Sequence, residues 1–317
     1  MDGTSILSVV VPCCNEESNL QAFYENLSEV ESKMDSVKFE YVFVDDGSND
    51  NTWILISKLA KSNPGVMGIK LSRNFGKEGA VLAGLSNAGG EAVVVIDCDL
   101  QHPPEIIPDM YKLWCEGEVD VVEGIKENRG SESIVYRAFA GIFYSVINKL
   151  SSVNLRDSSD FQLIDGKVAA IIANLPERQR FFRALSSWTG FKRAKVKFRV
   201  QARKSGRSKW SFFKLFRYAL NNITSFSSAP LQIVTLFGFI FFVAAVLLGI
   251  HTLHVFVSGY AVEGFTTVIL LLLIIGAMLM ISLGILGLYV AKIYEEIKGR
   301  PPFLIESVVT FDEEMTA

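Results

Sequence analysis

Long stretches of this sequence lack charge altogether. In a chain of 317 residues, no Asp, Glu, Lys or Arg occurs at 218–262 or at 264–291. A helix of about 20 apolar residues crosses a bilayer, so each stretch predicts one transmembrane helix. The residues before them are numerous enough for a globular domain with its own core. This pattern excludes an ordinary soluble protein, a collagen-like chain and a disordered chain.

Cysteine is also scarce. The chain has four cysteines, all before the uncharged stretches and without metal-ligand spacing, which excludes a disulfide scaffold and a zinc module. We expect them to be reduced, and buried as small apolar residues. The N-terminus enters an apolar run without the basic region of a signal peptide, so we expect the globular domain in the cytoplasm.

Acidic residues are absent from 178–217, a segment rich in Lys and Arg, whereas 1–177 is strongly acidic. A nucleic-acid arm is one interpretation of such a block. Because the block continues into the first uncharged stretch, anionic lipid headgroups or a phosphate ligand are the favoured partners, and nucleic acid is not expected. Aromatic residues alternate with cations at 209–218, as in an interfacial helix. The aromatic segment 134–150 fits an interface and a core equally well.

Flanking charges predict the orientation of the two apolar helices. Basic residues precede the first and follow the second, while the connecting loop carries only Glu263. By the positive-inside rule, both termini lie in the cytoplasm. The predicted organisation is a globular domain at 1–200, a basic interfacial segment at 201–228, two transmembrane helices at 229–292 and a cytoplasmic tail at 293–317.

Short runs rich in Val and Ile alternate with segments of helical length in the globular domain. This alternation predicts an α/β fold with a mostly parallel, doubly wound sheet. Ligands of such sheets bind beyond the carboxyl ends of the strands, near a topological switch point. The predicted strands are 7–11, 41–44, 66–71, 93–96 and 119–122, and the predicted helices are 17–33, 51–62, 77–88 and 105–116.

Polar residues follow several of the predicted strands. Asp97 and Asp99 follow the fourth, where two carboxylates could share Mg²⁺ with a nucleotide diphosphate. An isolated pair of this kind is more often two solvated loop acids. Here Asp45 and Asp46 end another strand of the same sheet, and the segment containing Lys77 adds cations for phosphates, which favours a binding site.

Two common nucleotide-binding motifs are missing from the sequence. The absence of GxGxxG after the first strand disfavours a Rossmann dehydrogenase, and the absence of GxxxxGK[ST] disfavours a P-loop NTPase.

The motifs PxxNE, DDGS, RNFGKEGA and DxDLQHPPE, in this order, closely resemble glycosyltransferase family 2, which has a GT-A fold. The resemblance is closest to its polyprenyl-phosphate branch, which includes dolichol-phosphate mannose synthase and bactoprenol glucosyltransferases. It implies an inverting enzyme of the cytoplasmic (inner) membrane that transfers a sugar from a nucleotide sugar to a polyprenyl phosphate. Glucose from UDP-glucose and undecaprenyl phosphate are the favoured substrates, and transfer of mannose, galactose or an amino sugar is the alternative.

The resemblance also implies the donor-side residues and the cofactor. Mg²⁺ or Mn²⁺ is expected on Asp97 and Asp99, with Asp99 also counted as catalytic. The nucleotide sugar is expected to contact Pro12, Glu16, Asp46, Ser48, Lys77, Asp97 and Gln101.

On the acceptor side, Asp160 lies in a segment that resembles the family's DTGDFRL and is the second predicted catalytic residue. It acts as a base, positions the acceptor or is only a turn residue. Gln162 stands where the family usually has Arg, so another cation must replace that Arg if it binds phosphate. The residues expected to bind the acceptor phosphate are Arg180, Arg183, Arg203 and Lys209.

Two other classes of function remain as alternatives. A binding module without catalysis would share the membrane helices, although the complete set of acidic motifs argues against it. A processive polysaccharide synthase has a related domain but usually needs more membrane helices and a QxxRW-type motif, which this sequence lacks. The family resemblance also implies a homo-oligomer as an option.

Overall fold

The computed structural model describes residues 5–126, 159–177, 181–198, 229–259 and 264–311. It divides into two units. The two apolar helices form one of them, and the described residues up to 198 together with those from 300 onwards form the other. The predicted interfacial segment 201–228 and the aromatic segment 134–150 lie outside the described residues.

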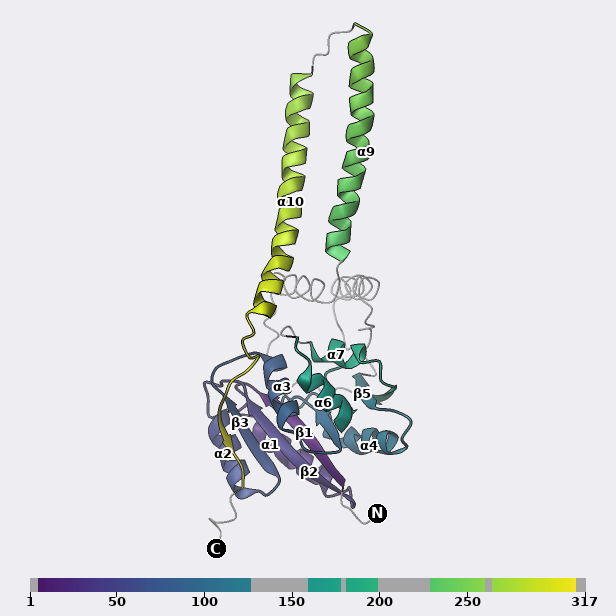
Figure 1. Ribbon diagram of the computed structural model, residues 1–317. Coiled ribbons are helices and arrows are strands. Elements are labelled where there is room, and N and C mark those ends of the chain that lie inside the picture. Colours follow the sequence, from purple (N-terminus) through teal and green to yellow (C-terminus); the bar gives the residue numbers. More distant parts are fainter. Residues whose placement is uncertain (1–4, 127–158, 178–180, 199–228, 260–263, 312–317) are drawn as a thin grey trace. The chain divides into compact units, whose positions relative to one another are not determined.

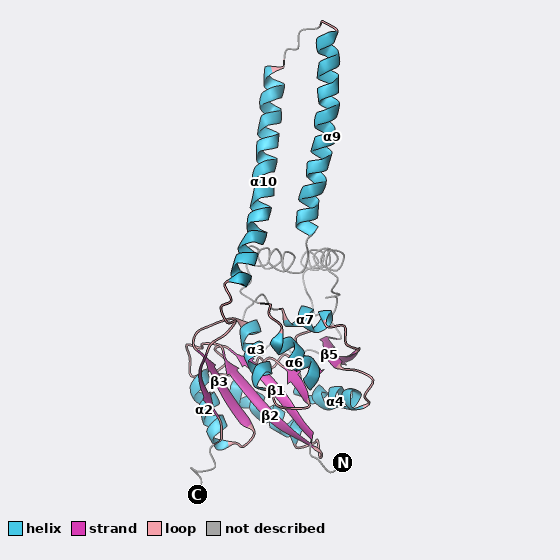
Figure 2. Ribbon diagram, in the orientation of Figure 1, coloured by secondary structure: helices cyan, strands magenta, loops and turns pink. Residues whose placement is uncertain are grey.

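An eight-stranded sheet is the centre of the globular unit (Figures 1 and 2). Its order is β7-β5-β6-β4-β1-β2-β3-β8, and β6 and β8 run against the direction of the other strands. The strands are β1 (Ser5–Cys13), β2 (Val37–Asp45), β3 (Val66–Leu71), β4 (Ala92–Val95), β5 (Val121–Lys126), β6 (Gln162–Asp165), β7 (Arg193–Phe198) and β8 (Ile305–Val309).

Helices cover both faces of this sheet and form two hydrophobic cores. On one face α1 (Leu20–Glu31), α2 (Thr52–Ser62) and α4 (Ile107–Cys115), which follows the short helix η1 (Pro104–Ile106), pack on the sheet. On the other face lie α3 (Lys77–Asn87), α6 (Gly166–Asn174) and Phe182 at the start of α7 (Phe182–Trp188). Because successive side chains of a strand point to opposite faces, β1 contributes Val9 to the first core and Val10 to the second.

The sheet confirms the predicted fold class, and each predicted strand and helix of the first 125 residues has a counterpart. The prediction did not include β6, β7, β8, α6 or α7. Strand β7 has the sequence RAKVKF, in which every second residue is a cation. It was not predicted because it lies within the basic segment and lacks the apolar run of a buried strand. Strand β6 has the sequence QLID, whose two apolar residues lie between a Gln and an Asp and do not form the Val- and Ile-rich run that marks the predicted strands.

Strand β8 comes from the segment that was predicted as a tail. It pairs antiparallel with β3, and Lys70 forms a 3.0 Å ion pair with Glu306. The backbone N–H of Ser72 donates to the Leu304 carbonyl at 2.9 Å. The predicted tail at 293–317 therefore contributes an edge strand to the globular unit.

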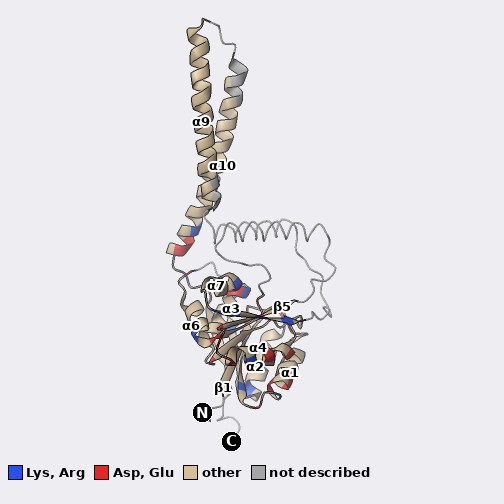
Figure 3. Cartoon of the chain, turned by 90° about the vertical axis from the view of Figure 1, so that its right-hand side faces the viewer, with Lys and Arg blue, Asp and Glu red and all other residues tan. Residues whose placement is uncertain are grey.

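The other unit contains α9 (Ala229–Val257) and α10 (Phe265–Ile297). Two spans within them, Val234–Val257 and Leu271–Ile297, are long and apolar enough to cross a membrane, with mean hydropathies of 2.4 and 2.7. Charged residues gather at the C-terminal end of α10, and the rest of both helices is uncharged (Figure 3). Within the described residues, each uncharged stretch of the sequence thus contributes one long helix.

The close approach of α3 to the sheet depends on Gly84. A Cβ atom at Gly84 would lie 2.2 Å from Cγ1 of Val10, so Gly84→Ala forces α3 away from β1. We expect a loss of about 1–3 kcal/mol in stability, measured as a lower melting temperature of the purified protein. Gly89→Ala is the control, because a Cβ there meets only the Glu40 carboxylate, at 3.5 Å. Equal melting temperatures for the two variants would contradict this account.

Candidate active site

The carboxyl ends of β1, β2 and β4 surround a cleft of about 400 Å³. Strand β1 has β2 on one side and β4 on the other, so the chain changes direction there across the sheet. This is the switch point at which open α/β sheets bind ligands. Six of the predicted site residues line the cleft together, namely Pro12, Glu16, Asp46, Lys77, Asp97 and Asp99.

Asp46 fixes the loop between β3 and α3. Its carboxylate accepts hydrogen bonds from the backbone N–H groups of Phe75 at 2.6 Å and Gly76 at 2.9 Å. Its carbonyl accepts a third from the Asn74 side chain at 3.1 Å. The turn is tight, since a Cβ on Gly47, whose φ is 64°, would lie 2.5 Å from the Asn74 nitrogen. Burial raises the pKa of Asp46, and the two N–H donors oppose that rise.

A second set of hydrogen bonds joins the loops after β1 and β2. The Ser48 hydroxyl accepts from the Asn15 N–H at 2.9 Å, and the Asn15 side chain accepts from the Asn49 N–H at 2.9 Å. The Glu16 N–H donates to the Thr52 hydroxyl at 2.9 Å. Burial raises the pKa of Glu16, whose carboxylate remains on the cleft. Ser48 does not line the cleft. In this structure, its hydroxyl instead holds the backbone of Asn15.

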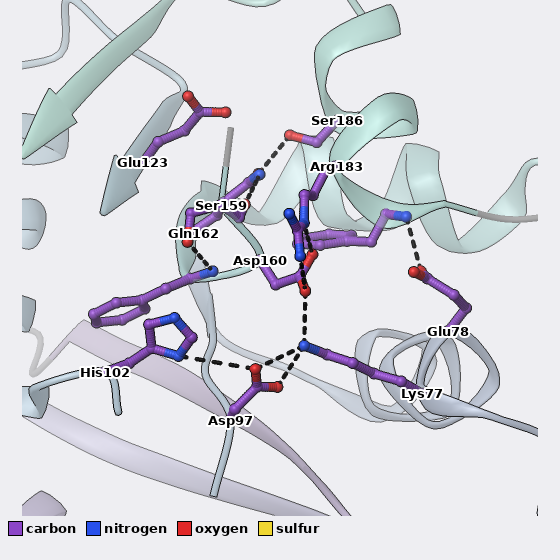
Figure 4. Close-up of polar contacts among 12 residues, drawn as sticks. Lys77, Glu78, Asp97, His102, Glu123, Ser159, Asp160, Gln162, Arg183 and Ser186 are labelled. Atoms are coloured by element: carbon purple, nitrogen blue, oxygen red, sulfur yellow. Dashed lines mark hydrogen bonds and ion pairs between the residues drawn. The ribbon is translucent and has the colours of Figure 1, made fainter. Parts of the chain in front are cut away.

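Lys77, the first residue of α3, joins two carboxylates from different parts of the sheet (Figure 4). Its ammonium nitrogen lies 2.6 and 2.7 Å from the two oxygens of Asp97 and 2.7 Å from Asp160. Asp97 follows β4, and Asp160 precedes β6. The structure therefore connects the predicted donor-side and acceptor-side acids through one lysine.

Asp160 has a second cationic partner in Arg183, which lies on α7. The guanidinium contacts the carboxylate through two nitrogens, and Nη2 lies 2.7 Å from Oδ2 (Figure 4). Burial disfavours the ionised form of Asp160, but the hydrogen bonds and charges of Arg183 and Lys77 outweigh burial and hold its pKa well below the usual range. Asp160 is therefore a poor proton acceptor at neutral pH.

Gln162 is buried and holds the turn that carries Asp160. Its side-chain nitrogen donates to the Ser159 carbonyl at 2.7 Å, and its oxygen accepts from the Ser186 hydroxyl at 2.6 Å. Arg193 continues the network, 3.1 Å from the Ser186 hydroxyl. Ser186 lies on the same short helix as Arg183, so this network sets the position of both partners of the Asp160–Arg183 pair. The described cation nearest to this turn is Arg183, which pairs with Asp160; whether it replaces the Arg that the family resemblance implies at position 162 stays a prediction.

Glu78 anchors the start of α7. Its carboxylate accepts a hydrogen bond from the Phe182 N–H at 2.8 Å. Burial, followed by the charge of Asp160, raises the pKa of Glu78 to about 7, against the opposing effects of that hydrogen bond, Lys77 and Arg183. Sequence reasoning missed Glu78, although it is adjacent to Lys77 in the RNFGKEGA motif.

Asp97 and Asp99 provide the oxygen donors that hard divalent cations prefer. In the described part of the chain, no three His, Cys, Asp or Glu side chains form a ready metal-binding group. The two carboxylates fit a Mg²⁺ or Mn²⁺ ion whose remaining ligands are substrate oxygens and water, as is usual for Mg²⁺. Asp99 accepts a 3.0 Å hydrogen bond from the Gln101 N–H across a turn in which Leu100 has a φ of 59°.

Other predicted residues lie off the cleft or outside the described residues. The side chain of Gln101 is not among those that line the cleft. Arg180, Arg203 and Lys209 fall in the segments that the structure does not describe. Of the four residues predicted to bind the acceptor phosphate, the described part of the structure therefore includes Arg183 alone, beside Asp160.

Comparison with known proteins establishes the family. The profile of glycosyl transferase family 2 matches residues 8–161. A prophage bactoprenol glucosyl transferase homolog of Escherichia coli is 37% identical over 95% of this chain and 99% of its own length. The chain belongs to glycosyltransferase family 2. A bactoprenol glucosyl transferase of Shigella phage SfX is 38% identical to this glycosyltransferase, over 95% of this chain and 99% of its own length.

A solved structure of glucosyl-3-phosphoglycerate synthase from Mycobacterium tuberculosis is 20% identical, with a TM-score of 0.46 over 70% of this glycosyltransferase and 80% of that chain. The relatives from Escherichia coli and Shigella phage SfX confirm the predicted family, and the mostly parallel sheet with helices on both faces agrees with the predicted GT-A architecture.

Glu78→Gln tests the electrostatic environment of α7. The folded pKa near 7 lies above the usual 4.5, so the folded protein binds more protons between these values and loses stability as the pH rises through them. Gln keeps an oxygen for the Phe182 N–H but carries no charge. We expect the variant to melt a few degrees above the wild type at about pH 8 and at the same temperature at about pH 4.

Glu25→Gln on the exposed face of α1 is the control and should match the wild type at both values. If the difference in melting temperature between Glu78→Gln and the wild type is the same at both pH values, ionisation of Glu78 does not destabilise the folded protein, and this account is wrong.

Proposed function

We propose that this glycosyltransferase transfers glucose from UDP-glucose to a membrane polyprenyl phosphate, such as undecaprenyl phosphate, at the cytoplasmic face of the membrane. The names of the relatives, which are bactoprenol glucosyl transferases aligned over nearly their full length, support the acceptor and the sugar. The two apolar helices support a membrane location. The product is a lipid-linked sugar, the class of donor used to modify cell-surface glycans.

The observation that carries this proposal is the bridge by Lys77 between Asp97 and Asp160. The donor diphosphate is proposed to lie in the cleft, which Asp97 and Asp99 line. The acceptor phosphate is proposed to approach from the side of Asp160 and Arg183. A single reaction centre between the two sets of residues brings donor and acceptor into contact, as transfer requires.

In the proposed reaction, a phosphate oxygen of the acceptor attacks the anomeric carbon, the new C–O bond forms, and the bond from that carbon to the UDP oxygen breaks. Attack from the face opposite UDP inverts the anomeric centre. A phosphate monoester with a second pKa of about 6 is largely dianionic at neutral pH, so it needs no base. Asp160 is proposed to orient Arg183 and Lys77 toward the reacting phosphates.

Asp97 and Asp99 would hold Mg²⁺ or Mn²⁺, which when bound supplies positive charge to the departing diphosphate. Lys77 adds a cation on the same side. The basic segment at 201–228, with Arg203 and Lys209, and Arg180 are proposed to draw the lipid phosphate to the site from the headgroup layer. A homo-oligomer is a further proposal, supported by family resemblance alone.

An assay with labelled nucleotide sugars tests the function. Membranes containing the protein are incubated with labelled UDP-glucose, and GDP-mannose and UDP-N-acetylglucosamine serve as competing donors. We expect label from UDP-glucose in the lipid phase. Label in a long water-soluble polymer would instead indicate a polysaccharide synthase, and binding without transfer would indicate a binding module.

Asp99→Asn should abolish the transfer in the same assay while the protein stays folded and in the membrane. The loss of one carboxylate from a two-carboxylate metal site is expected to lower turnover by about two orders of magnitude or more. Asp109→Asn, an exposed acid on α4, is the control and should retain full activity. Near-normal turnover of Asp99→Asn would remove Asp99 from the site.

Asp160→Asn distinguishes a positioning acid from a base. Because its pKa lies below the usual range, Asp160 is ionised throughout the working pH range and cannot cause the titration of activity. We expect a loss of about 10- to 1,000-fold in turnover, with the midpoint of the pH profile still near the acceptor's second pKa of about 6. A variant without activity at any pH would instead favour a base.

A further inference from the structure

The ammonium group of Lys77 is fully occupied by the two acids. It has three N–H donors, and three carboxylate oxygens lie within 2.7 Å, two from Asp97 and one from Asp160. Asp160 has the guanidinium of Arg183 as a further cationic partner. Lys77 thus contacts Asp97 through the same carboxylate oxygens that a divalent cation would need.

The charges set up a competition at Asp97. A dication bound to this carboxylate would lie within a few ångströms of the ammonium and repel it, and repulsion at such distances is strong away from bulk water. Asp97 and Lys77 both line the cleft. Lys77 therefore occupies the position on Asp97 that the dication would take.

The backbone just before Lys77 is held by hydrogen bonds, while its charge lies at the end of a long side chain. The preceding residues are held by the Asp46 carboxylate through the Phe75 and Gly76 N–H groups. Lysine carries its charge at the end of a flexible chain of four carbons. A nucleotide diphosphate in the cleft would offer the ammonium new oxygen acceptors within that reach, while Asp160 would keep its pairing with Arg183.

We propose that Lys77 acts as an internal cation that covers Asp97 until the donor arrives and then moves to the donor diphosphate, which frees Asp97 for the divalent cation. This inference rests on the proposed function and assigns Lys77 as a positioning residue. The nucleotide and the divalent cation should then bind cooperatively, because each favours the same position of the lysine. The move also removes one of the two cations from Asp160, so the acceptor-side acid responds to the donor.

Mn²⁺ binding to the full-length protein in detergent tests this inference without reference to turnover. Free Mn²⁺ is measured by electron paramagnetic resonance, with and without UDP. For the wild type we expect weak Mn²⁺ binding alone and a gain of about tenfold or more with UDP. Lys77→Met should bind Mn²⁺ about tenfold more tightly than the wild type without UDP, and the further gain from UDP should be smaller than in the wild type, because only direct ligation by the diphosphate remains. A purely structural lysine would not produce tighter binding when removed.

Two controls make the result specific. Lys33→Met removes an exposed lysine that pairs with Glu29 on α1 and should behave as the wild type. Lys77→Gln, checked by its melting curve, replaces Lys77→Met if the latter does not fold. No gain in Mn²⁺ affinity in the Lys77 variant, or the same gain in Lys33→Met, would overturn the inference.

Asp97→Asn separates this failure from a failure of the proposed function. We expect this variant to lose Mn²⁺ binding with and without UDP. If Asp97→Asn loses binding and Lys77→Met gains none, the inference about Lys77 is wrong and the proposed metal site stands. If Asp97→Asn binds Mn²⁺ as the wild type does, the metal site itself is wrong, and the role of Lys77 is overturned with it.

Discussion

The ammonium of Lys77 between Asp97 and Asp160 is the interaction on which the site depends. Two carboxylates this close repel each other, and partial burial increases the cost of leaving them without a cation. Lys77 meets this constraint for both, and Arg183 adds a second partner to Asp160. Burial lowers the pKa of Lys77, but the charges of Asp160 and Asp97 more than offset this effect and raise it. Lys77 and Asp160 therefore each favour the ionised form of the other.

The rest of the globular unit brings these four groups to one place. Helix α3 starts at Lys77 because the Asp46 carboxylate holds the loop before it, and the helix lies close to β1 because Gly84 has no side chain. Asp97 is placed by β4, which pairs with β1 on the side opposite β2. The electrostatics of the cleft thus depend on the hydrophobic packing of the sheet and its helices.

The region of Asp160 and Arg183 is held by hydrogen bonds as well as by hydrophobic packing. Gln162 and Ser186, both buried, connect the turn of Asp160 to the helix of Arg183. Glu78, which follows Lys77 directly in the sequence, accepts a hydrogen bond from the Phe182 N–H at the start of that helix. A few short contacts therefore connect Asp97 and Lys77 in the cleft to the turn of Asp160 and the start of α7.

The sequence alone determined the family, the two apolar helices and the positions of the acids at strand ends, because motifs and periodicity are local patterns that survive without coordinates. It did not reveal that Lys77 pairs with Asp160, that Arg183 is the second partner, or that Gln162 is buried. It also did not reveal that residues after α10 add β8 to the edge of the sheet. These contacts join residues from 23 to 236 positions apart, and only tertiary packing decides which distant side chains meet.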